Sequence, residues 1–244
     1  MVFGLFSKEK ALKRAQKKAL NKLAQSQDRW PAMQRLANAG DDECLYTLLK
    51  RFSFQSTKQV EDLDEKDWVV QAVMAKGPAA LPAIERYLLD AEGISYPLRI
   101  LEGVATPEQA AAIVDKVLDK ELPGYTRDPA KKIDLINWLG EYQQMSAEEM
   151  CRRVAPYVGD YDENVRFAAV ESIGLRPKEC AAEAMVTRLL DPEEESRRLK
   201  LRIAEVLAEA DMDLGGRHQE VAELFESVLP EFKLHRNKLV KKTA

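Results

Sequence analysis

The stretch Gly159–Gly174, GDYDENVRFAAVESIG, decides how the rest of the chain is interpreted. Four of its apolar residues recur at the spacing of one helical face: Val165, Ala168, Ala169 and Ile173. This spacing predicts an amphipathic helix that begins at about residue 163. Asp162 stands where an N-cap residue would accept a backbone N–H, and Gly174 stands where the helix would stop.

The same stretch has nearly the ligand spacing of an EF-hand calcium loop. Asp160, Asp162 and Asn164 occupy alternate positions, and Glu171 is the twelfth residue counted from Asp160. The sixth position of such a loop needs a glycine for its sharp turn, but Val165 stands there, and a β-branched residue strongly disfavours positive φ. A helix from residue 163 would also carry Glu171 away from the turn. We therefore expect no metal at this stretch and a structural role for its residues.

Apolar residues recur at helical spacing along almost the whole chain, and no long alternating pattern typical of strands is present. The pattern divides into six pairs of short helices. The expected stops of the first helix in each pair are Gly40, Gly77, Ala105, Gly140, Gly174 and Ala210. The stops follow one another at intervals of 37, 28, 35, 34 and 36 residues, and the near-constant interval indicates a repeat array. The sequence therefore predicts an all-α fold over residues 28–229.

Asp160, Val165–Arg166, Ala168–Ala169 and Gly174 together resemble a HEAT repeat of the bacterial HEAT-like type. In that family the Asp and the Arg six residues later hydrogen-bond within and between neighbouring repeats. The resemblance implies a right-handed α-solenoid of about six HEAT-like helix pairs, with Asp160 and Arg166 joining neighbours.

The motif is specific in this one repeat and partial elsewhere. Leu98–Arg99 and Leu201–Arg202 repeat the Val-Arg step, but Gly93 and Ser196 stand where the Asp would be. The first, second and fourth pairs show neither feature. The sequence therefore predicts the helix pairing throughout and the Asp–Arg hydrogen bonds in the fifth pair only.

The formal net charge of −4 conceals two basic ends around an acidic body. Residues 1–25 carry a net charge of +6 and residues 230–244 a net charge of +4, so the residues between them carry −14. We expect three parts: a basic amphipathic helix over residues 1–25, the repeat array over residues 28–229, and a basic tail or capping helix over residues 230–244.

The basic N-terminal segment has two interpretations. Its narrow apolar stripe consists of Leu12, Ala15, Ala19 and Leu23. It could cap the apolar end of the array with its lysines solvated, which we favour, or it could bind an anionic membrane surface or an acidic partner. Two polar insertions, Phe52–Asp64 and Lys120–Ala130, are expected to be surface loops.

The sequence carries no glycine-rich phosphate loop and no nucleophile elbow. His218 and His235 are expected on the solvated surface. The three cysteines are odd in number and widely spaced, which favours reduced thiols and a cytoplasmic protein. Because no long apolar run or secretory signal is present, we expect neither a membrane span nor secretion. We expect no catalytic residue, no metal and no cofactor.

These observations favour a non-enzymatic protein-binding scaffold, whose partner has a basic surface that complements the acidic body. An enzymatic alternative is a HEAT-like DNA glycosylase, and the only residues that vaguely resemble its site are Trp138 and Asp134 on one helix. The acidic body disfavours binding to nucleic acid. Docking to a membrane through residues 1–25 is a further alternative. If the second helices line the binding face, the candidate contacts are Glu85, Arg86, Arg152, Arg153, Arg188, Glu223 and Glu226.

Overall fold

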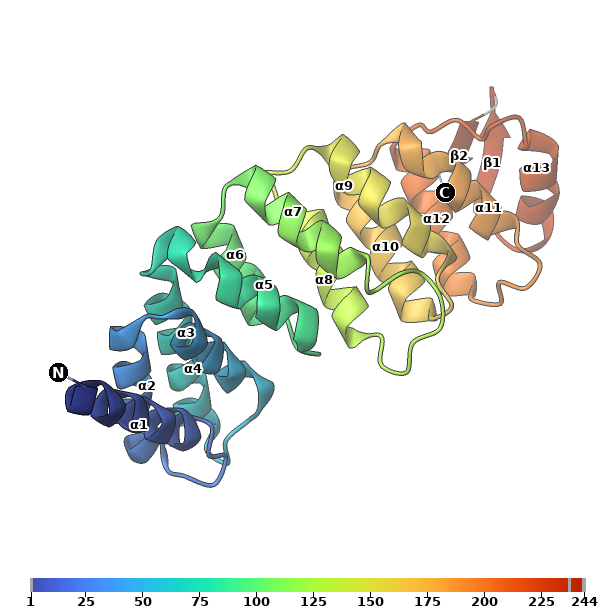
Figure 1. Ribbon diagram of the computed structural model, residues 1–244. Coiled ribbons are helices and arrows are strands. Elements are labelled where there is room, and N and C mark those ends of the chain that lie inside the picture. The colour runs from blue at the N-terminus through green and yellow to red at the C-terminus, as the bar shows by residue number, and fades with distance from the viewer. Residues whose placement is uncertain (1, 237, 243–244) are drawn as a thin grey trace. The chain divides into compact units, whose positions relative to one another are not determined.

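The computed structural model describes residues 2–236 and 238–242, and their side chains except those of residues 2–8, 226 and 227. The chain divides into two compact units, Met1–Lys120 and Glu121–Ala244. Both units are helical, which confirms the all-α class, and in the described part of the chain strands occur only near the C-terminus (Figure 1).

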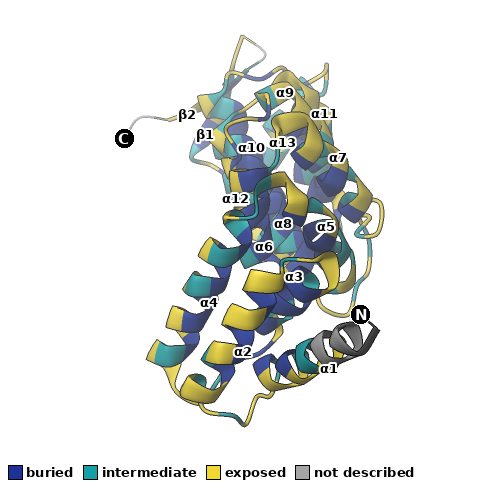
Figure 2. Ribbon diagram, turned by 60° about the vertical axis from the view of Figure 1, so that its left-hand side comes forward, coloured by how far each residue is buried: buried dark blue, intermediate teal, exposed yellow. Residues whose placement is uncertain are grey.

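The first unit consists of two layers of helices. α2, α4 and α6 pack on one another in order, and α3, α5 and α7 do the same beside them. Figure 2 shows buried residues on the inner sides of α2 and α4 and exposed residues on their outer sides. Its elements are α1 (Val2–Ala19), α2 (Ser26–Ala39), α3 (Asp42–Leu49), η1 (Lys50–Ser53), α4 (Gln59–Met74), η2 (Gly77–Ala80), α5 (Leu81–Asp90), α6 (Ser95–Val104) and α7 (Pro107–Leu118), where η denotes a 3₁₀ helix.

The second unit has the same two-layer construction. α8, α10 and α12 form one layer, and α9 with η3, α11 and α13 form the other. Its elements are α8 (Ala130–Glu141), α9 (Ala147–Val154), η3 (Ala155–Gly159), α10 (Glu163–Leu175), η4 (Glu179–Ala181), α11 (Ala182–Leu190), α12 (Arg197–Glu209), α13 (His218–Ser227), β1 (Phe232–His235) and β2 (Lys238–Lys241).

The basic C-terminal segment, expected to be a tail or a capping helix, contains two paired strands instead. β1 and β2 pair antiparallel, with Phe232 opposite Lys241. Successive strand residues point to opposite faces, so Leu239 is buried against the unit while Val240 beside it is exposed. Lys241 binds Glu205 of α12 at 2.9 Å, which secures the hairpin on that helix.

Each predicted helix pair is present, but one predicted loop is shorter than expected. α4 begins at Gln59 and η1 extends to Ser53, so eight of the 13 residues of the predicted loop Phe52–Asp64 are helical. The helix starts before the predicted end of the loop because Asp62 and Glu65 bind the buried cations Arg51 and Arg29. These ion pairs fix polar residues on the inner face of the helix. The predicted loop Lys120–Ala130 lies outside the helices except for Ala130, the first residue of α8.

Two glycines predicted to stop helices act in different ways. Gly40 adopts the left-handed conformation, φ 66°, and ends α2 as predicted. Gly140 lies within α8, and a Cβ there would approach the Cβ of Ser172 on α10 to 2.7 Å. Its predicted role as a stop is therefore wrong: the absence of a side chain allows two helices to approach closely.

The expectation of three reduced thiols is also wrong. Cys151 on α9 and Cys180 on η4 form a disulfide across 29 residues of sequence, because α9 and η4 pack together. Cys44 is a buried free thiol, and burial raises its pKa to about 12.

Candidate functional site

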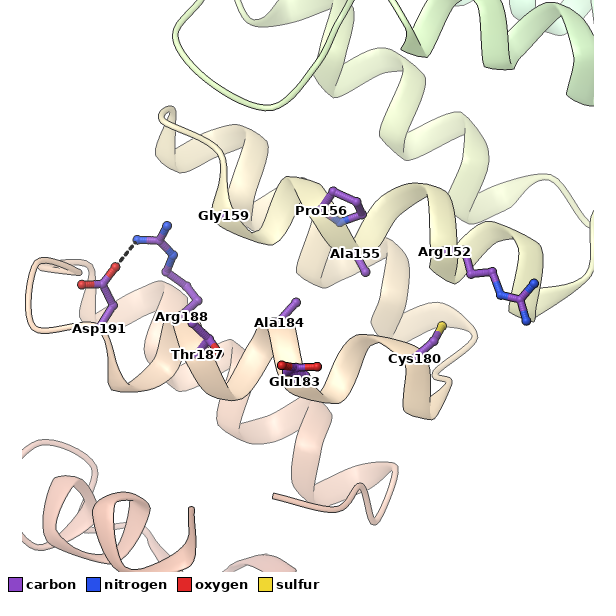
Figure 3. Close-up of a pocket in the computed structure, with 10 residues that line it drawn as sticks. All are labelled: Arg152, Ala155, Pro156, Gly159, Cys180, Glu183, Ala184, Thr187, Arg188 and Asp191. Carbon is purple, nitrogen blue, oxygen red and sulfur yellow. Dashed lines mark hydrogen bonds and ion pairs between the residues drawn. The ribbon is translucent and has the colours of Figure 1, made fainter. Parts of the chain in front are cut away.

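A hollow of about 570 Å³ lies in the second unit between α9–η3 and α11. Figure 3 shows Ala155 and Ala184 approaching each other across it from the two sides. At one end Arg188 binds Asp191 at 2.8 Å, and at the other end Arg152 lies near Cys180. The complete lining is Arg152, Ala155, Pro156, Gly159, Cys180, Glu183, Ala184, Thr187, Arg188 and Asp191.

A second hollow, of about 480 Å³, lies on the other side of α11. It is bounded by the segment Asp213–Gly215 and by Arg217, which binds Glu220 at 2.9 Å. Glu183 and Thr187 line both hollows, so these two exposed side chains form a ridge with a depression on each side. We call this surface, from Arg152 to Arg217 across α11, the α11 groove.

The predicted contact residues of the second unit lie partly in this groove. Arg152 and Arg188 line it, whereas Arg153 donates to the backbone oxygen of Glu149 at 3.2 Å. Glu223 is exposed on α13 and accepts a hydrogen bond from Gln219. The side chain of Glu226 lies outside the described residues. The groove thus brings together two of the predicted residues, and sequence reasoning missed Glu183 and Thr187.

In the first unit Glu85 and Arg86 share a smaller hollow of about 320 Å³ along α5. The guanidinium of Arg86 lies 3.7 Å from the centre of the Tyr46 ring and binds Glu43 at 3.0 Å. Glu85 binds Lys116 of α7 at 2.6 Å. Both predicted residues therefore lie on the second-helix layer, but each already holds an ionic partner from a neighbouring helix.

The Asp160 carboxylate, predicted to join neighbouring helix pairs, is almost completely buried. It binds the Lys132 ammonium of α8 at 3.1 Å and accepts the backbone N–H of Gly124 at 3.0 Å. Its other oxygen accepts the N–H of Asp162 at 2.9 Å. Asp160 therefore connects its own turn with the preceding pair, as the resemblance implied.

Arg166 connects the same turn with the following pair. It donates to the backbone oxygens of Asp160 and Tyr161 at 3.0 and 2.8 Å, and it binds the buried Glu194 carboxylate at 2.8 Å. Glu194 in turn accepts the N–H of Ser196 at 2.9 Å. Asp160 and Arg166 therefore join neighbours in opposite directions and contact each other through the Asp160 backbone.

These contacts recur at one register. Lys132, Arg166 and Lys200 are 34 residues apart, and each donates to a backbone oxygen of the turn before its own helix. The carboxylate partner follows 28 residues later both for Lys132 (Asp160) and for Arg166 (Glu194). The fourth pair lacks the Asp and the Val-Arg step, as the sequence indicated, but Lys132 makes the contacts of the Arg. In the sixth pair the corresponding residue is Lys200, two residues before the proposed Arg202, and Glu194 takes the place of the Asp.

The EF-hand-like residues form a helix start and an ion pair. Asp162 accepts the N–H groups of Asn164 and Val165 at 2.8 and 3.2 Å, which confirms it as the N-cap of α10. Glu171 binds Arg202 of α12 at 2.6 Å. Among the described residues, no group of three or more His, Cys, Asp or Glu side chains could hold a metal ion.

The residues behind the glycosylase alternative do not form an open aromatic site. Trp138 is part-buried and stacks on Tyr142, with ring centroids 4.4 Å apart. Asp134 lies on the same helix. His218 begins α13 and His235 is exposed in β1, so the two histidines lie on different elements.

A buried ionic cluster in the first unit was not predicted. Glu65 binds both Arg29 at 3.0 Å and Arg51 at 2.6 Å, and Asp62 binds Arg51 at 2.6 Å and Lys66 at 2.7 Å. Burial alone would raise the pKa of Asp62, but hydrogen bonds from Lys66 and Arg51 lower it to about 2. The cluster connects α2, η1 and α4, which makes it a structural joint.

The N-terminal helix α1 packs against α2 and α3. Ala15 and Ala19 of the predicted stripe are buried, whereas Leu23 lies beyond the helix end and is 94% exposed. Among the described side chains of α1, five cations face solvent: Lys10, Lys13, Arg14, Lys17 and Lys18. Ala15 and Ala19 of the stripe are therefore occupied by contacts within the first unit.

Comparisons with protein-family models, with curated proteins and with solved structures find no match to this chain. Within residues 2–236 and 238–242, no helix combines the length and the apolar character needed to cross a membrane.

Proposed function

We propose that this protein is a non-enzymatic protein-binding scaffold, built as an α-solenoid of HEAT-like helix pairs. The observation that carries the proposal is the α11 groove, a depression on both sides of one helix of the second layer. Repeat proteins use such a layer as an extended binding face.

The lining suits contact with another protein surface better than proton transfer. Its floor contains small residues, among them Ala155, Gly159 and Ala184, which allow a partner backbone to approach. Arg188 and Arg217 are held in ion pairs with Asp191 and Glu220, so their guanidinium groups are already oriented. Ordered charges around a shallow apolar floor favour specific protein contact.

The buried contacts at the 34-residue register support the solenoid. The Lys132–Asp160 and Arg166–Glu194 ion pairs each link one helix pair of the second unit to the next through a buried carboxylate, in the manner that the HEAT-like resemblance implies. Such links hold neighbouring helix pairs at fixed spacing, which a scaffold needs.

The proposal is tested by blocking the groove. A Glu183→Arg/Thr187→Tyr double variant fills both depressions with exposed side chains, and Asn137→Arg, exposed on α8 in the other layer, is the matched control. The measurement is affinity purification from native lysate with quantitative mass spectrometry. We expect the wild type and the control to recover at least one partner equally. The double variant should recover about tenfold less of that partner. Recovery of every partner by the double variant, with unchanged thermal unfolding, would refute the proposal.

A further inference from the structure

Three large apolar side chains of the second unit face solvent, and two of them are in contact. Leu122, Tyr125 and Tyr161 are 65%, 75% and 71% exposed, and the two tyrosine rings meet edge to face with centroids 5.4 Å apart. We call these three residues the tyrosine surface. Tyrosine is enriched at the centres of protein interfaces because it offers a large area with few rotatable bonds.

The backbone beneath the tyrosine surface is fixed by buried groups. Gly124, next to Tyr125, donates to Asp160 at 3.0 Å and accepts from Lys132 at 2.8 Å. Tyr157 donates to the backbone oxygen of Glu121 at 2.9 Å. The backbone oxygen of Tyr161 accepts from Arg166 at 2.8 Å. Both rings are therefore presented from ordered turns, and little conformational entropy is lost when a partner binds.

The turns around the tyrosine surface are acidic. Turn 159–163 is joined to turn 191–196 by the Arg166–Glu194 ion pair and by the Ser196–Glu163 hydrogen bond of 2.6 Å. Within residues 121–129, 159–163 and 191–196 the exposed carboxylates are Asp128, Glu163, Glu193 and Glu195, and the exposed cation is Arg127. An anionic ligand such as a nucleic acid or a phospholipid bilayer would be repelled here, whereas a cationic one would be attracted.

We propose that the tyrosine surface docks an arginine-bearing cationic segment of a partner protein. A guanidinium group stacks on the open face of a tyrosine ring and at the same time pairs with a carboxylate, which an ammonium group does less well. The surrounding carboxylates steer such a segment to the rings. This inference rests on the proposed protein-binding function and assigns it a second surface, whose three residues do not line the α11 groove.

The test uses synthetic nine-residue peptides of alternating glycine and arginine, or glycine and lysine, titrated calorimetrically into the full chain. We expect the arginine peptide to bind more tightly than the lysine peptide. Tyr125→Ala and Tyr161→Ala should each weaken its binding about tenfold, and Tyr125→Phe should bind as the wild type does, because the ring makes the contact. Leu175→Ala, an exposed apolar residue of α10, is the matched control and should leave the affinity unchanged.

Equal affinity of the wild type and a Tyr125→Ala/Tyr161→Ala variant would overturn the inference, as would the absence of measurable binding to the wild type. The groove variant Glu183→Arg/Thr187→Tyr separates the two proposals, because it should bind the arginine peptide normally. If the tyrosine variants have no effect but the groove variant loses its partner, the scaffold proposal stands alone. If only the tyrosine variants have an effect, the groove is not the binding face.

Discussion

The Lys132 ammonium and the Asp160 carboxylate lie 3.1 Å apart, and both are buried between successive helix pairs of the second unit. Both groups also bind the same glycine, since Gly124 donates to Asp160 and accepts from Lys132. One ion pair therefore fixes a helix, a turn and a loop.

Breaking this pair from one side should be costly, because the remaining charge stays buried without its partner. We expect Asp160→Asn and Lys132→Met each to lower the free energy of unfolding by about 3–5 kcal/mol, and the double variant to recover part of that loss. Urea denaturation of the four proteins measures the coupling. Strictly additive single effects would show that the two groups act independently.

The depressed pKa of Asp62 gives the first unit a defined acid sensitivity. The ordinary pKa of 3.8 applies to the unfolded chain and the value of about 2 to the folded protein, so the charged carboxylate stabilises the fold above pH 4. That contribution, about 2 kcal/mol, should be lost as the pH falls from about 4 to about 2.

Thermal unfolding at a series of pH values tests this assignment. Asp62→Asn should be less stable at neutral pH and should lose less stability than the wild type between pH 4 and pH 2. Asp64→Asn, at an exposed position of the same helix, is the control. A full acid-induced loss in Asp62→Asn would assign the sensitivity to other groups.

Gly140 should tolerate no side chain. In Gly140→Ala the new Cβ would lie 2.7 Å from Ser172, whose hydroxyl is already bound to the Ile136 oxygen. We expect overpacking of about 1–3 kcal/mol to outweigh the gain in helix propensity of about 1 kcal/mol.

Chemical denaturation provides the measurement for Gly140→Ala. A second change, Ser172→Gly, should relieve the clash, and Gly93→Ala, where a Cβ meets nothing within 4 Å, should be nearly neutral. An unchanged midpoint in Gly140→Ala would mean that α8 and α10 can separate freely.

The Cys151–Cys180 disulfide should stabilise the second unit. A bridge that spans 29 residues lowers the entropy of the unfolded chain by an amount worth about 3–4 kcal/mol. We expect the reduced protein, or Cys180→Ala, to unfold at a lower urea concentration. Thiol labelling of the unreduced, denatured protein should modify Cys44 alone, and three labelled cysteines would contradict the bridge.

The sequence predicted the helices well because helix pairs rest on a local apolar period and on end signals such as Asp162. It predicted the buried contacts at the 34-residue register poorly, because the Asp and Arg of the fifth pair have different residue types at the corresponding positions of the other pairs. Lys132 and Glu194 carry the same chemistry as Arg166 and Asp160, and the constant spacing of 34 residues was the signal that could have revealed them.

Other features had no signal in a single sequence. The α11 groove depends on how α9–η3 lies beside α11, and the Cys151–Cys180 bridge depends on the same packing. Charged residues such as Arg29 and Glu65 are ordinarily exposed, so their burial follows only from the three-dimensional position of their partners.

The constant register gives the second unit a modular character. Deleting residues 133–166 would join Lys132 directly to Phe167 and would place Lys132 28 residues before Glu194, the separation that Arg166 has in the intact chain. The shortened chain would keep a cation and a carboxylate at matching positions. Excision of one whole period would therefore shorten the unit without creating an unpaired buried charge.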